Sequence, residues 1–269
     1  PDETERRFTD DLLIELAAHG FGHAILSAGD EIAQASPSED LPVDISMDVG
    51  SRSNSDMGNP IAFPWSNNRR EPAHGAAPWQ HLSPLELLAY MSKAGRRTTI
   101  VDRQWVEAAG SPVNWDPIPD WFLIREFEDL WAYARVLDQW IPTILLGEKT
   151  WVSTSESHRT AILRGIVEGK TTATSGPQIL FSINENMQGS NVYSEFSDIE
   201  FNPIVDIRVE NPGDIKRMSL IGSGGVELIS WKIGSPPNHF PLSTSNWVLV
   251  TAQGEEDWAI TNPIWLKRP

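Results

Sequence analysis

The chain has 269 residues, a formal net charge of −16 and no cysteine. The charge argues against a surface that binds nucleic acid or an anionic membrane, because both need clustered lysine and arginine side chains. The lack of cysteine excludes disulfide bonds, thiolate nucleophiles and zinc–thiolate sites, and no apolar run reaches the roughly 18 residues that a membrane-spanning helix needs.

Helices and strands alternate over the first two thirds of the chain. Apolar residues at helical spacing predict helices over 9–20, 83–95, 126–141 and 157–169. In the third helix the stripe consists of Phe127, Leu130, Trp131, Ala134 and Leu137. Short apolar runs predict strands over 23–28, 96–102 and 149–154. This alternation is typical of an α/β layer or barrel.

A long segment, 35–78, interrupts this pattern and is rich in Ser, Asn, Pro and Gly. Loops of this length inside a compact domain are lids, partner-binding surfaces or disordered segments. From Pro177 onward, short strand-like runs are separated by Gly, Asn, Pro and Ser, which predicts an all-β sandwich. We therefore expect two domains, a reduced α/β domain over 1–176 and a β-sandwich over 177–269.

Several segments resemble the PHP (polymerase and histidinol phosphatase) family of metal-dependent hydrolases, in the large branch where a β-sandwich follows the metal-binding barrel. They are "GDEI" at 29–32, "LWAYARVLDQWIPTILLGEKTWVSTSESHR" at 130–159, "GIVEGKTTATSGPQILFSI" at 165–183 and "DWAITNPIWL" at 257–266. The resemblance implies a truncated or degenerate PHP-like barrel followed by the sandwich.

The resemblance also implies where a metal would bind. Glu31 matches the family's bridging carboxylate, and Glu156 and His158 match the metal ligands at a strand end. Alternation along a strand points Glu156 and His158 to one face, so they could share a divalent Mn, Fe or Zn ion. Asp102, at another strand end, could serve as a ligand or base. The other interpretation of Glu156 and His158 is that they are polar loop residues bonded to the local backbone.

Other positions depart from the family pattern. The first-strand Asp/His-x-His segment is missing, Asn59 stands where a histidine ligand is expected, and Arg103 stands in the place of another. A guanidinium group cannot ligate a cation. A reduced ligand set of this kind does not make the multi-metal site that phosphoester hydrolysis uses.

Four of the 12 tryptophans lie among Pro and Asn residues and are expected to be exposed or half-exposed: Trp65, Trp79, Trp115 and Trp121. Exposed tryptophan is enriched where proteins bind proteins, and sugars also stack on it. These four residues are therefore candidate partner-binding residues.

The sequence supports three functional hypotheses. The first is a non-catalytic PHP-like homologue that serves as a binding or scaffold subunit of a larger protein assembly, with protein partners and no cofactor. The second is a metal-dependent phosphoesterase that uses the reduced site, and the third is a carbohydrate-binding module. The chain begins with Pro1 rather than Met, which favours a processed, periplasmic or extracellular protein and leaves a cytoplasmic one open.

Overall fold

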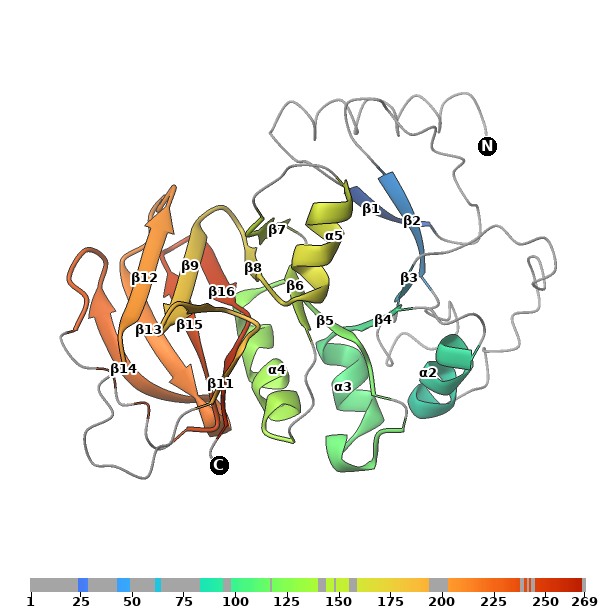
Figure 1. The fold of residues 1–269 in the computed structure, drawn as a ribbon. Coiled ribbons are helices and arrows are strands. Elements are labelled where there is room, and N and C mark those ends of the chain that lie inside the picture. The colour runs from blue at the N-terminus through green and yellow to red at the C-terminus, as the bar shows by residue number, and fades with distance from the viewer. Residues whose placement is uncertain are drawn as a thin grey trace. The chain divides into compact units, whose positions relative to one another are not determined.

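Figure 1 shows the computed structural model of the chain. The residues that the structure describes are 24–28, 43–48, 61–63, 83–93, 98–116, 118–139, 144–147, 149–154, 159–193, 203–237, 240, 242 and 245–267. The chain forms two compact units. The first holds Pro1–Trp121 and Glu156–Ile162, and the second holds Phe122–Ser155 and Leu163–Pro269. The predicted domain boundary near residue 177 stays a prediction. The division of the chain into the two compact units falls at other positions.

Among the residues that the structure describes, the first unit holds four whole strands, two whole helices and the first residues of a third helix. Its elements are β1 (Ala24–Ala28), β2 (Val43–Asp48), β3 (Ile61–Phe63), α2 (Pro84–Lys93), β4 (Thr98–Val101), α3 (Arg103–Ala109) and the 3₁₀ helix η3 (Pro112–Asn114). Strands β1 and β2 are parallel, whereas β2, β3 and β4 pair antiparallel. The predicted helix over 9–20 lies outside the described residues.

The start of α2 follows from its first residues. Ser83 Oγ accepts the Glu86 amide at 3.4 Å, and the Glu86 carboxylate accepts the Ser83 amide at 2.8 Å. This reciprocal capping box satisfies amides that have no partner inside the helix. The Ser83 hydrogen bonds hold the pKa of Glu86 below its ordinary value. The predicted helix start at Ser83-Pro84 is confirmed.

The second unit is dominated by strands. It begins with β5 (Trp121–Ile124, whose first residue belongs to the first unit), η4 (Phe127–Asp129), α4 (Leu130–Leu137), β6 (Ile144–Gly147), β7 (Lys149–Val152), α5 (Arg159–Val167, divided between the units) and β8 (Thr171–Thr174). It continues with β9 (Gln178–Ile183), β10 (Asn186–Met187), β11 (Asn191–Tyr193), β12 (Val205–Glu210), β13 (Arg217–Gly222), η5 (Ser223–Gly225), β14 (Val226–Lys232), β15 (Trp247–Gln253), β16 (Trp258–Thr261) and β17 (Ile264–Lys267).

Two sheets of this unit share one hydrophobic core. A three-stranded sheet has the order β10–β9–β12, and a larger one has the order β11–β17–β15–β16–β8–β7, with β13 beside β15 and β14 beside β13. Phe181 of β9 and Val250 of β15 are both fully buried in the core between them. Full burial of a large apolar side chain contributes about 1.5–3 kcal/mol. The β-rich second half is thus confirmed, in the manner expected of a β-sandwich.

The predicted fold class, an α/β PHP-like barrel or layered domain, is wrong. Strand residues outnumber helical ones in the described chain, and none of its sheets closes into a barrel. The pairing of β7 with β8 gives a physical reason. The helix α5 connects these strands, yet they are antiparallel, with Val152 opposite Thr171. A barrel of alternating strands and helices needs parallel strands on either side of each helix.

Helix α4 also departs from its expected packing. Leu130, Ala134 and Leu137 are buried as predicted, but the Trp131 side chain is 51% exposed. Its ring lies against the η5 turn, where a Cβ added to Gly225 would be 3.0 Å from a ring carbon. The turn places Gly224 and Gly225 at φ of 77° and 68°, which glycine adopts most readily.

A buried carboxamide connects the early strands of this unit to its last ones. Asn262, between β16 and β17, is 1% exposed. Its Oδ1 accepts the Leu145 amide at 2.8 Å and the Tyr133 hydroxyl at 3.3 Å. Its Nδ2 donates to the Leu145 carbonyl at 3.2 Å and to Thr171 Oγ1. Burial raises the pKa of Tyr133 well above its usual range, so the hydroxyl keeps its proton and donates.

Replacing Asn262 with alanine tests this connection. The Asn262→Ala variant leaves the Leu145 amide buried without its acceptor, and each such group costs about 1–3 kcal/mol. We expect the free energy of unfolding, measured by urea denaturation, to fall by about 2–4 kcal/mol. The exposed Asn246 gives the control, because Asn246→Ala should change stability by no more than about 0.5 kcal/mol. Equal losses in both variants would contradict the assignment.

Candidate functional site

The sequence predicts a metal site at Glu31, Glu156 and His158. Glu31, Glu156 and His158 lie outside the described residues, as do Asn59, Trp65 and Trp79. Within the described part of the chain, no three His, Cys, Asp or Glu side chains are grouped so that they could hold a metal ion. The metal site therefore stays a prediction.

Asp102 is a helix cap. It follows β4 directly, is 7% exposed, and its Oδ1 accepts the Trp105 amide at 3.1 Å at the start of α3. Capping of this kind contributes about 1 kcal/mol. The next residue, Arg103, extends along the helix surface, where its Nε donates to Glu107 Oε1 at 2.9 Å. The structure thus brings Asp102 to a strand end, as expected, but commits an oxygen of its carboxylate to the backbone.

The expected exposure of Trp115 and Trp121 is wrong. Their side chains are only 5% and 3% exposed. The Trp115 ring packs edge-on against Trp105 of α3, with 4.9 Å between ring centroids. The 3₁₀ turn of η3, which has Pro112 in its first turn, precedes Trp115 directly. A proline-rich context therefore does not indicate exposure here, and the assignment of these two residues to partner binding stays a prediction.

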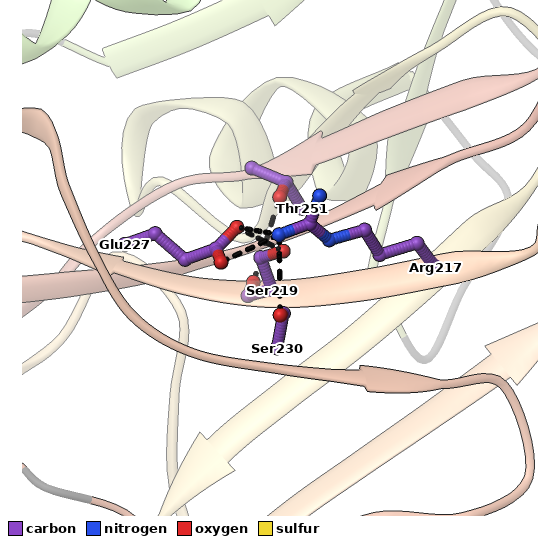
Figure 2. Close-up of polar contacts among 5 residues, drawn as sticks. All are labelled: Arg217, Ser219, Glu227, Ser230 and Thr251. Carbon is purple, nitrogen blue, oxygen red and sulfur yellow. Dashed lines mark hydrogen bonds and ion pairs between the residues drawn. The ribbon is translucent and has the colours of Figure 1, made fainter.

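A cluster of polar side chains lies on β13, β14 and β15 (Figure 2). Arg217 Nη2 donates to both carboxylate oxygens of Glu227, at 2.6 and 2.7 Å, and to Ser230 Oγ at 3.2 Å. Ser219 Oγ donates to Glu227 Oε2 at 2.8 Å. We call Arg217, Ser219, Glu227 and Ser230 the β14 cluster. Thr251 extends it weakly, since its hydroxyl lies 3.5 Å from the Ser219 carbonyl.

Strand alternation explains why these side chains meet. On β13, Met218 and Leu220 face the core, so Arg217 and Ser219 point to the opposite face. Ser230 is directly opposite Ser219 on β14. A bulge then shifts the register, so that Leu220 is opposite Ile229 but Ile221 is opposite Glu227. The bulge keeps Glu227 on the face of Arg217.

The charges of the β14 cluster are balanced. Partial burial raises the pKa of Glu227, but hydrogen bonds from Ser219 and Ser230 and the charge of Arg217 outweigh it and hold the pKa below its ordinary value. A carboxylate that stays ionised and fully bonded is a poor general base. The β14 cluster is therefore better suited to orienting β14 against β13 than to acid–base catalysis.

A second group of carboxylates joins the turn before β13, which holds Asp214, to the turn before β16, which holds Glu255, Glu256 and Asp257. Asp214 accepts the backbone amides of Glu255, Glu256 and Asp257 at 2.6, 3.1 and 3.0 Å, and the Asp214 amide donates to Asp257 Oδ2 at 3.0 Å. The Asp214 carboxylate is occupied by backbone donors, so it fixes the turn. These bonds, led by that from Glu256, hold the pKa of Asp214 below its ordinary value.

No family model, no curated protein and no solved structure matches the chain. The resemblance to the PHP family therefore stays a prediction. None of the helices in the described ranges has the length and hydropathy to cross a membrane.

The sequence carries a signal for part of the β14 cluster. In "RMSLIG", polar Arg217 and Ser219 alternate with apolar Met218 and Leu220, which predicts one polar face. The contact with Glu227 could not be predicted, because it depends on the bulge in β14.

The acidic turn makes stability depend on pH. The folded-state pKa of Asp214 is depressed, so its contribution is present above the unfolded pKa of about 3.9 and is lost as pH falls through the folded value. We expect Asp214→Asn to be less stable at pH 7 and to lose less further stability between about pH 5 and pH 3 than the parent protein, in denaturation series. Glu210→Gln, at an exposed residue, is the control and should have the same pH dependence of stability as the parent protein. A parallel pH dependence of Asp214→Asn and the parent would contradict this role.

Proposed function

We propose that the chain is a binding or scaffold subunit of a larger protein assembly, and that strand β14 forms part of its contact surface. The carrying observation is that β14 is a seven-residue strand paired on one side with β13 and with no other described strand. An unpaired edge presents a row of backbone donors and acceptors to which another chain can add a strand.

Two further features support a contact surface at this place. Val226, the first residue of β14, is 56% exposed, and Trp131 of α4 is exposed beside the η5 turn that precedes it. Tryptophan is among the residues that contribute most to protein–protein binding.

The Asp138 side chain, at the end of α4, fixes this arrangement. Its carboxylate accepts the Gly224 amide at 2.8 Å and Trp247 Nε1 at 3.0 Å, which holds the helix end to the η5 turn and to β15. A surface whose conformation is fixed in advance loses less conformational entropy on binding.

The test isolates the chain from cells that encode it and measures two properties: the mass of the species that contains it, by sedimentation, and its metal content. We expect it to sediment well above the mass of one chain, and we expect Trp131→Ala to reduce the share in the larger species at least tenfold. Trp151→Ala, which changes an exposed tryptophan on β7, is the matched control. A chain that sediments alone and holds one equivalent of Mn, Fe or Zn, lost in the Glu156→Ala, His158→Ala double variant, would contradict the proposal and favour a hydrolase.

A further inference from the structure

Along the outer edge of β14, no strand that the structure describes pairs with the main-chain groups. Among the described residues, the hydrogen bond that involves its backbone outside the β13 ladder is the turn from the Ser235 amide to the Lys232 carbonyl at 3.1 Å. A strand added here would satisfy the remaining groups and extend the larger sheet by one strand.

The charges along β14 are complementary to themselves when the strand is reversed. Glu227 lies near its start and Lys232 at its end. Lys232 is directly opposite Arg217, and Glu227 bonds to Arg217, so both side chains belong to the outward face of the sheet. A second β14 running antiparallel brings each Lys232 to the end that carries Glu227.

We propose that the partner of this edge is a second copy of the chain, paired antiparallel through β14 around a two-fold axis at Ser230. In this register Ser230 is opposite Ser230, Ile229 is opposite Trp231, and Lys232 is opposite the bulge formed by Glu227 and Leu228. Directly opposite residues share a face in an antiparallel pair, and this register meets that condition for Ile229 and Trp231, which both pack toward the core. The inference rests on the proposed binding function of β14 and names its partner.

Two other effects act on this contact. The charge of −16 on each copy is repulsive at long range, but the screening length is about 8 Å at 0.15 M salt, so the charges at the edge decide the pairing. The bulge and Lys232 are also features that keep an edge strand from pairing with arbitrary strands. The two-fold register places the lysine of one copy against the bulge of the other, so it accommodates both features.

The lack of cysteine in the full chain makes a disulfide test direct. In the Ser230→Cys variant the two new thiols lie on opposite residues of an antiparallel pair, whose Cα atoms are about 4.5–5.5 Å apart, within the range that a disulfide bridges. We expect mild oxidation at tens of micromolar protein to convert most of the chain to a covalent dimer. Ser235→Cys is the matched control, since this exposed serine lies beyond the strand end and far from the axis; it should stay monomeric.

A second variant tests the pairing without new thiols. Lys232→Glu places a carboxylate against Glu227 of the other copy, and we expect the dimer dissociation constant, measured by sedimentation equilibrium, to rise at least tenfold while the melting temperature of the monomer is unchanged. A monomeric parent protein with no Ser230→Cys cross-link would overturn the self-pairing. If the parent is monomeric but Trp131→Ala still reduces the share of a larger native species, the proposed function stands and the partner is another protein. If the native chain forms no larger species at all, the proposed function is also wrong.

Discussion

The second unit depends on how Asn262 satisfies the main chain of Leu145. The carboxamide offers one acceptor and one donor side by side, as a peptide group does, so it bonds both the amide and the carbonyl of Leu145. Because the same side chain also bonds Tyr133 and Thr171, residues more than 90 positions away in the sequence are held at one point. A buried polar group of this kind stabilises only when it is fully bonded. The segment 122–155 is therefore part of the same compact unit as the strands of the C-terminal half.

In the proposed association, the contact is made by β14, which pairs with β13 on one side and with no other strand that the structure describes. Asp138 fixes α4 to the η5 turn, and the β14 cluster fixes the outward face of β14. An exposed ion pair such as Arg217–Glu227 adds only about 0–1 kcal/mol to stability. Its contribution is to orient β14, because Arg217 also bonds Ser230 and Ser219 also bonds Glu227. These contacts hold β14 to β13 on both sides of the bulge.

Local signals in the sequence predicted local structure well. The Ser83-Pro84 helix start, the strand before Asp102 and the strand-rich second half could all be predicted from capping residues, proline and alternation. The prediction of a barrel was wrong because periodicity says nothing about strand direction: β7, α5 and β8 follow one another as expected, but the two strands are antiparallel. The exposure of Trp131 and the burial of Trp115 were mispredicted for a related reason, since each depends on a contact outside its own element: Trp131 contacts the η5 turn, and Trp115 contacts Trp105 of α3.

The β-rich second unit is proposed to associate through the outer edge of β14. Backbone hydrogen exchange at submicromolar and at high micromolar protein concentration measures this directly. We expect amides of β14 to become markedly more protected at the higher concentration, while those of β12, an edge strand of the smaller sheet, and of the buried strand β15 exchange as before. Amides of β14 that exchange at the same rate at both concentrations, while those of β12 become protected, would contradict it.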